Sequence, residues 1–206
     1  MEAKDFVDEL VARARKAQEE YEKFSQEQAD AIVRACAKAV YDNAEYLARL
    51  AVDETRMGVY EHKIQKNKGK AKVIWNSLKG KKSVGILSRN EETGITEIAR
   101  PVGVVGAVTP CTNPVVTPMC NAMFALKGLN AIIIGPHPRS KNTSYETVRL
   151  MNEAIAKLGA PKNLIQIIEE PTVELSSALM HAVDVVVATG GMPMVRSAYS
   201  SGKPAY

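Results

Sequence analysis

The sequence predicts an α/β protein in which N-terminal helices and a β-hairpin precede a partial, doubly wound parallel sheet. Three observations support this fold class. Of the charged residues, 36 precede Pro101 and 14 follow it, whereas all ten prolines lie at or after that position. Apolar residues in the first part recur at helical spacing. The second part alternates continuous apolar runs with helical patterns, as expected for βαβ units whose strands are covered on both faces.

Residues 1–82 are predicted to form a helical segment with four amphipathic helices. The first carries an apolar face near the N-terminus. The second begins after Ser25, because Ser25 and Gln28 have the spacing of a capping box. A third helix is expected around Leu47, and a fourth over about 61–77, where apolar positions again recur at helical spacing.

Residues 83–100 are predicted to form a β-hairpin. Val84–Leu87 and Ile95–Ile98 are short strand-like runs, and Asn90–Gly94 between them has the composition of a turn.

Residues 101–206 are predicted to alternate strands and helices. The strand candidates are Val102–Val108, Ala131–Ile134, Leu164–Ile168 and Val183–Ala188. The helical patterns cover about 115–127, 143–158, 173–181 and 192–199. Together they predict a doubly wound parallel sheet.

Composition excludes several classes of protein. The formal net charge of +4 is modest and mixed in sign, so it identifies no charged partner. The basic stretch His62–Lys82 holds eight lysines and no acidic residue, but it lacks the interleaved aromatics of an RNA-binding module. We therefore expect a solvated helix face and no nucleic-acid partner. With no signal peptide and no apolar run long enough for a membrane span, we expect a cytoplasmic protein.

Cysteine usage argues against a structural metal or disulfide framework. Cys36, Cys111 and Cys120 are few, odd in number and lack CxxC spacing. Cys36 and Cys120 fall within amphipathic helices, where we expect them to pack. No metal site is predicted.

Ligands of doubly wound sheets bind at the carboxyl ends of the strands, and three loops lie there. They are Thr109–Pro114, Gly135–Lys141 and Thr189–Pro193. The first loop lacks the glycines of the GxGxxG dinucleotide fingerprint. From spacing alone, a nucleotide site and a purely structural sheet remain open.

Two segments carry a more specific resemblance. The first is Arg100–Pro110, followed by Asn113 and Pro114; the second is Asn130–Ile134, followed by Pro136–Arg139. The first resembles the opening Rossmann strand and loop of the aldehyde dehydrogenase superfamily, and the second resembles its CoA-acylating branch. Shorter segments that fit the same branch are Gly159–Pro161, Glu174–Ser176, Ala178–His181, Ala188–Gly191 and Ala198–Ala205.

The resemblance implies that 101–206 is an incomplete Rossmann-like cofactor-binding domain and that 83–100 belongs to the oligomerisation region of a homo-oligomer. It also implies an oxidoreductase that converts a short aldehyde, CoA and NAD or NADP reversibly to acyl-CoA and the reduced cofactor. A cysteine thiolate attacks the aldehyde in that family. The resemblance puts this cysteine beyond Tyr206, so that the 206-residue chain alone is expected to be inactive, and it makes Cys111 a small loop residue. The alternative is a non-catalytic nucleotide-binding or assembly fragment.

The resemblance also implies site residues. An asparagine in the loop after the first Rossmann strand donates its amide to the oxyanion in the wider superfamily; one alignment puts Asn113 there and a gapless one puts Thr112 there. From the residues alone, Asn113 could instead cap the following helix. Arg139 could bind a phosphate of NADP or CoA, or lie in solvent. The cofactor-binding candidates are Thr109, Pro110, His137, Pro138, Arg139, Thr189, Gly190 and Gly191.

Overall fold

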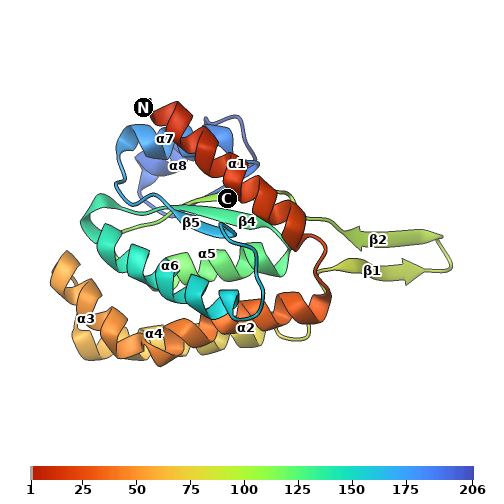
Figure 1. Ribbon diagram of the computed structural model, residues 1–206, viewed down its shortest axis with the longest axis horizontal. Helices are drawn as coiled ribbons and strands as arrows, with labels where there is room; N and C mark the ends of the chain where they lie inside the picture. Colours follow the sequence, from red (N-terminus) through yellow and green to blue (C-terminus); the bar gives the residue numbers. More distant parts are fainter. Residues whose placement is uncertain (1) are drawn as a thin grey trace.

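The structure is a computed structural model that describes residues 2–206. It confirms an α/β fold with N-terminal helices, a hairpin and a parallel sheet (Figure 1). The elements are, in order, α1 (Ala3–Tyr21), α2 (Gln26–Asp42), α3 (Ala44–Thr55), α4 (Tyr60–Leu78), β1 (Gly85–Asn90), β2 (Ile95–Ala99), β3 (Val104–Val108), α5 (Val116–Lys127), β4 (Ala131–Gly135), the 3-10 turn η1 (Pro138–Ser140), α6 (Lys141–Ala156), β5 (Ile165–Ile167), α7 (Val173–Ala182), β6 (Val185–Ala188) and α8 (Met192–Tyr199).

The sheet has the strand order β5-β4-β3-β6, and all of its pairs are parallel. Its two central strands, β3 and β4, are buried along their whole length. Helices cover both faces of the sheet, which is why these strands are continuous apolar runs. Residues 204–206 also run beside β6, where Val186 and Ala205 form a parallel bridge.

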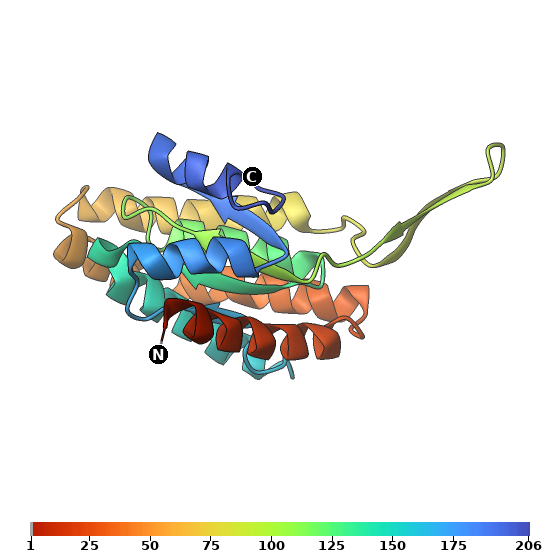
Figure 2. The ribbon, with the colours of Figure 1, turned by 90° about the horizontal axis from the view of Figure 1, so that it is seen from above.

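Helices cover the sheet on both faces (Figures 1 and 2). Helices α1 and α7 pack together on one face, and α5 and α6 cover the other. Helix α2 packs against α5 and α6 from outside, and α3 and α4 extend that outer layer. The N-terminal helices thus complete the core of the sheet domain through residues such as Val7, Leu10 and Val33, which are fully or nearly fully buried.

The predicted capping box at the start of α2 is confirmed. Ser25 Oγ accepts a hydrogen bond from the backbone N–H of Gln28, and the Gln28 side chain accepts one from the backbone of Ser25. These bonds satisfy two amide donors at the helix start.

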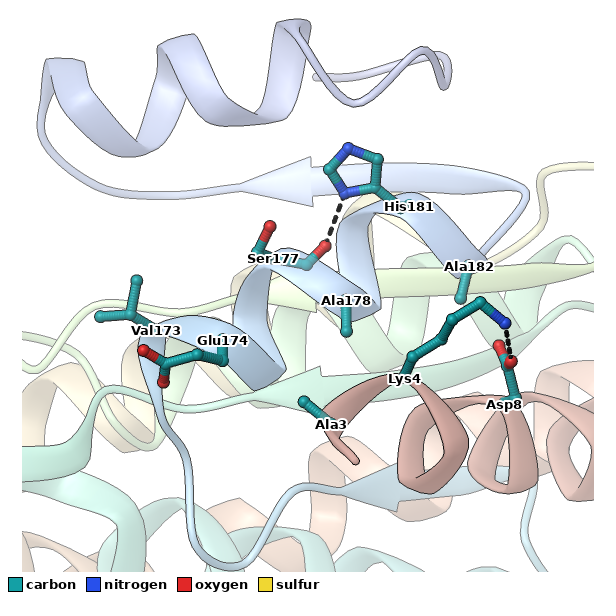
Figure 3. Close-up of a pocket in the computed structure, with 9 residues that line it drawn as sticks. All are labelled: Ala3, Lys4, Asp8, Val173, Glu174, Ser177, Ala178, His181 and Ala182. Atoms are coloured by element: carbon teal, nitrogen blue, oxygen red, sulfur yellow. Dashed lines mark hydrogen bonds and ion pairs between the residues drawn. The ribbon is translucent and has the colours of Figure 1, made fainter. Parts of the chain in front are cut away.

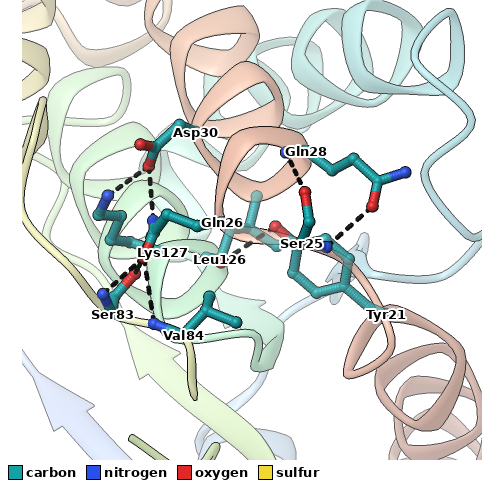
Figure 4. Close-up of polar contacts among 9 residues, drawn as sticks. All are labelled: Tyr21, Ser25, Gln26, Gln28, Asp30, Ser83, Val84, Leu126 and Lys127. Atoms are coloured by element: carbon teal, nitrogen blue, oxygen red, sulfur yellow. Dashed lines mark hydrogen bonds and ion pairs between the residues drawn. The ribbon is translucent and has the colours of Figure 1, made fainter. Parts of the chain in front are cut away.

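A polar network ties α2 to α5 and to the segment before the hairpin (Figure 4). Gln26 Oε1 accepts hydrogen bonds from the backbone N–H groups of Ser83 and Val84, at 2.7 and 3.1 Å. Asp30 forms an ion pair with Lys127, whose side chain is only 5% exposed. The hairpin therefore emerges from a fixed base.

The hairpin itself projects from the body of the molecule (Figure 2). Strands β1 and β2 pair antiparallel, with Ile86 opposite Ile98 and an irregularity between Ile86 and Ser88. Ile86, Ile95 and Ile98 are all exposed. Isolated two-stranded ribbons are marginally stable in water. Packing within the hairpin does not explain why three isoleucines lie exposed on it.

Several predicted strand boundaries are wrong. The run Leu164–Ile168 shortens to Ile165–Ile167, and the run Val183–Ala188 begins at Val185. The strand predicted over Val102–Val108 begins at Val104, because Gly103 has a φ of 114°. A Cβ at Gly103 would lie 2.3 Å from Asp184 Oδ2, so only glycine fits there. Within residues 2–206, no helix has the combination of length and apolar composition that crossing a bilayer requires.

Candidate functional site

The topology creates a switch point between β3 and β6. The chain runs from β3 through α5 to β4 and through α6 to β5, then returns through α7 to β6 on the other side of β3. The next two strands, β4 and β5, therefore lie on one side of β3, and β6 lies on its other side. In open α/β sheets, ligands bind in the crevice at this point, beyond the carboxyl ends of the strands.

A cavity of about 610 Å³ lies at these strand ends. It is lined by the loops that follow β3, β4 and β6, together with residues from α7 and α8. Seven of the sequence-predicted residues line it: Thr109, Pro110, His137, Pro138, Thr189, Gly190 and Gly191. Three loops that are separate in sequence thus meet at one hollow.

Thr109 supplies an unpartnered polar atom in this cavity. The residue is 2% exposed, and its hydroxyl oxygen has no hydrogen-bond partner among the described residues. Its backbone N–H donates to Gly135 O at 3.0 Å, which fixes the residue at the end of β3. A buried hydroxyl without a partner costs free energy, so a ligand with a polar group fits this position.

The loop after β6 offers backbone amides. Gly191 is the N-cap of α8, and no side chain caps that helix. Pro193 has no N–H, and the N–H groups of Met194 and Val195 donate to Gly191 O, which leaves the N–H groups of Gly191 and Met192 for an anionic or polar ligand group. Glycine at 191 also leaves room, since a Cβ there would meet nothing closer than Pro193 Cδ at 3.8 Å.

The loop after β4 is held by a local hydrogen bond. His137 Nδ1 accepts from the backbone N–H of Arg139 at 3.1 Å, and Pro138 begins the turn η1. Arg139 is exposed and does not line the cavity. It is the one predicted cofactor residue that the structure leaves apart from the other seven.

Thr112 and Asn113 lie in the loop after β3, beyond Thr109 and Pro110, but they do not line this cavity. Asn113 Oδ1 accepts a hydrogen bond from Lys66 Nζ at 2.6 Å, and Asn113 Nδ2 donates to Thr112 Oγ1 at 3.4 Å. The lysine ammonium has only donors, so it holds the amide with its oxygen toward α4 and its NH₂ group away from it. The capping interpretation of Asn113 is wrong, because Val115 is the N-cap of α5 and no side chain caps it.

The three cysteines differ in environment. Cys36 is fully buried, and burial raises the pKa of its thiol to about 12. Burial also raises the pKa of Cys120. Cys111 lines the cavity, with its sulfur 3.9 Å from Met57 Sδ. Within the described residues, no group of three or more His, Cys, Asp or Glu side chains is arranged to hold a metal ion.

A second hollow, of about 730 Å³, lies between α1 and α7 (Figure 3). Among its polar side chains, Lys4 pairs with Asp8, and His181 Nδ1 lies 2.8 Å from Ser177 O in its own helix. The hollow is lined by none of the three loops at the strand ends.

Sequence reasoning missed two groups of residues near the site. Ser176 and Met180 of α7 line the cavity, and Lys66 of α4 contacts Asn113. The basic stretch on α4 was expected to be solvated, but Lys63 is 6% exposed and Lys66 is half-buried. The spacing of these two lysines, one helical turn apart, is the signal that places them on a common face.

The chain is similar to known proteins over nearly its full length. It is 54% identical to the succinate-semialdehyde dehydrogenase (acetylating) of Clostridium kluyveri, a match that covers 97% of this chain and 44% of that protein. The structure resembles an acetylating aldehyde dehydrogenase from Geobacillus thermoglucosidasius, with a TM-score of 0.96, 43% identity and coverage of 99% of this chain and 46% of that one. The chain therefore spans less than half the length of these proteins.

A third similar protein was solved with a bound ligand. A propionaldehyde dehydrogenase from Rhodopseudomonas palustris, solved with bound CoA and an acylated cysteine, has a TM-score of 0.83 and 35% identity, covering 97% of this chain and 46% of that one. The model of the aldehyde dehydrogenase family matches residues 1–205. Together with the parallel sheet and the loops at its switch point, this match shows that the chain belongs to the aldehyde dehydrogenase family.

Proposed function

We propose that the complete protein converts a short aldehyde, CoA and NAD⁺ or NADP⁺ to acyl-CoA, the reduced cofactor and a proton, and that it also runs the reverse reaction. The observation that carries this proposal is the cavity at the β3–β6 switch point, which seven predicted cofactor residues line. The acetylating and CoA-bound relatives support the acyl-transfer half. The C. kluyveri relative is named for succinate semialdehyde, an aldehyde whose far end carries a carboxylate.

The residues of the cavity suit a nicotinamide dinucleotide. Thr109 offers a buried hydroxyl without a partner, and Gly191 offers a close backbone approach at a helix start. The bound nicotinamide would accept the hydride of the aldehyde carbon. His137 and Pro138 would border the other end of the cofactor, and Arg139, exposed beside them, would reach a phosphate of NADP or CoA.

Asn113 would hold the oxyanion that forms when a thiolate adds to the aldehyde. Its NH₂ group points away from Lys66 and makes only a long contact with Thr112, so it can donate to a developing negative charge. Thr112 is the alternative donor. We further propose that the nucleophilic cysteine is none of the three described here, because Cys36 is fully buried, Cys120 is half-buried within α5 and Cys111 contacts Met57.

We also propose a division of the chain into three parts. Residues 1–82 complete the core as a helical segment, 83–100 form a hairpin for oligomerisation, and 101–206 form part of the cofactor-binding domain. The exposed isoleucines of the hairpin support contact with another subunit.

A substitution at Gly191 tests the cofactor site. The complete protein with Gly191→Val should bind NAD(H) or NADP(H) at least about tenfold more weakly, a loss of about 1.4 kcal/mol. A Cβ at this position would meet no protein atom closer than Pro193 Cδ at 3.8 Å, so the substitution is expected to crowd the ligand more than the fold. Calorimetric titration with the cofactor measures the affinity, and thermal melting checks the fold. Wild-type affinity in a normally folded variant would remove the β6 loop from the site.

A further inference from the structure

The main chain around Asn113 is held by α5 and α6. Asn113 O accepts a hydrogen bond from the backbone N–H of Thr117, in the first turn of α5, at 3.2 Å. The next carbonyl, Pro114 O, accepts one at 3.1 Å from Ser144 Oγ of α6, a residue that is fully buried. These bonds fix the backbone of Asn113, but its terminal amide can still rotate to present either its oxygen or its NH₂ group.

Among the described residues, two hydrogen bonds reach this amide. Lys66 Nζ donates to Asn113 Oδ1 at 2.6 Å, and Asn113 Nδ2 donates to Thr112 Oγ1 at 3.4 Å. A threonine hydroxyl can donate or accept and would therefore tolerate either orientation of the amide, whereas an ammonium group can only donate. Of the two partners, Lys66 is thus the one that decides which end of the amide faces away from α4.

No acidic side chain competes with Asn113 for Lys66. Within residues 2–206, no carboxylate lies within 4.0 Å of the Lys66 ammonium group, whereas Lys68 on the same helix pairs with Glu45 at 3.0 Å. Lys66 is also half-buried, and the next residue anchors α4 to α3, because Asn67 Nδ2 donates to Ala44 O at 3.3 Å. A charge-assisted bond to an amide oxygen polarises the amide, which strengthens its NH₂ group as a donor.

We propose that Lys66 is a positioning residue for the reaction: it holds the NH₂ group of Asn113 toward the oxyanion and strengthens it as a hydrogen-bond donor. This inference rests on the proposed function, because it takes Asn113 as the oxyanion donor. Without Lys66, the amide could turn its oxygen toward the developing negative charge, which would be repulsive. Lys66 does not line the cavity, so its effect would pass through Asn113 and not through the cofactor.

A double-mutant cycle in the complete protein tests this role, with CoA-dependent oxidation of butyraldehyde or succinate semialdehyde as the assay. Lys66→Met removes the ammonium group, keeps most of the apolar stem, and should lower kcat at least about tenfold. In the Asn113→Ala background, the same change should lower kcat by less than about twofold, because the effects of residues that act as a unit are not additive. Calorimetric titration should show the same cofactor affinity in Lys66→Met as in wild type.

Lys72→Met is the matched control, since Lys72 is an exposed lysine of the same helix, and it should leave kcat unchanged in both backgrounds. If thermal melting shows that Lys66→Met does not fold, Lys66→Gln takes its place in the cycle. A glutamine amide can donate or accept, so it no longer fixes the orientation of Asn113. Its loss of kcat should likewise be confined to the background that keeps Asn113.

Equal losses in both backgrounds, or wild-type kcat in the Lys66 variant, would overturn the inference while the proposed function stands. Wild-type kcat in Asn113→Ala would remove Asn113 as the oxyanion donor and Lys66 with it, although CoA-dependent oxidation by the wild type would still stand. Failure of wild type to oxidise either aldehyde with CoA would overturn the proposed function, and this inference would fall with it.

Discussion

Among single residues, Asn113 shows what the structure adds to the sequence. The sequence places it in a loop after a buried strand, and two alignments with the family leave Asn113 and Thr112 as rival oxyanion donors. The structure adds the orientation of the amide, because Lys66 Nζ can only donate and therefore faces the amide oxygen. The contact joins residues 47 positions apart and depends on how α4 packs against α5. No local pattern in the sequence predicts it.

Asn113→Ala in the complete protein should lower kcat by roughly 100-fold or more, about 2.7 kcal/mol, because an oxyanion donor acts mainly in the transition state. Cofactor affinity should change little, since Asn113 does not line the cavity. Steady-state kinetics and cofactor titration measure the two effects. If Thr112→Ala causes the loss and Asn113→Ala does not, Thr112 is the donor. If both variants retain wild-type kcat, the loop only supports the fold.

The elements follow closely from the sequence. Helix α2 begins where the Ser25 capping box predicts, and the four apolar runs of the second part become the four parallel strands. These features depend on local spacing and capping, which act within a few residues. The start of β3 was missed because it depends on Asp184, far along the chain, which leaves space only for glycine at 103.

The ion pair between α2 and α5 should show an asymmetric response to substitution. Asp30→Ala leaves the buried ammonium of Lys127 without its carboxylate, which should cost about 2–4 kcal/mol of unfolding free energy; this is below the full range for buried pairs because Asp30 is 25% exposed. Lys127→Met removes the buried charge itself and should cost less than about 1 kcal/mol. Urea unfolding of the two variants measures the difference. Similar losses in both would mean that Lys127 is effectively solvated.

The hairpin should matter for association. Ile86 and Ile98 face each other across the two strands and are 42% and 56% exposed. Changing both to serine in the complete protein should shift the oligomer to smaller species, because apolar area is lost from the proposed contact. Sedimentation velocity gives the distribution of species. Val73→Ser, at an exposed apolar position on α4, is the control and should leave it unchanged. An oligomer that is indifferent to the hairpin substitutions would place the interface elsewhere.

In the molecule as a whole, the sheet topology brings residues that are far apart in sequence together at one site. Strand order puts the loops after β3, β4 and β6 at one edge, so residues as far apart as Thr109 and Gly191 line the same cavity. The sequence predicts these loops because ligand sites of doubly wound sheets follow the carboxyl ends of strands. It does not predict that Arg139 lies outside the cavity or that α7 forms one wall, since both depend on the packing of helices around the sheet.

If the complete protein is an acylating aldehyde dehydrogenase, as we propose, its oxidation of aldehydes must depend on CoA. Butyraldehyde or succinate semialdehyde is supplied with NAD⁺ or NADP⁺, with and without CoA. Reduced cofactor is followed by absorbance, and the acyl product is identified by mass spectrometry. We expect reduced cofactor to form only when CoA is present, in equal amount with acyl-CoA. Equally fast oxidation without CoA, with the free acid as product, would show that the protein is not an acylating enzyme.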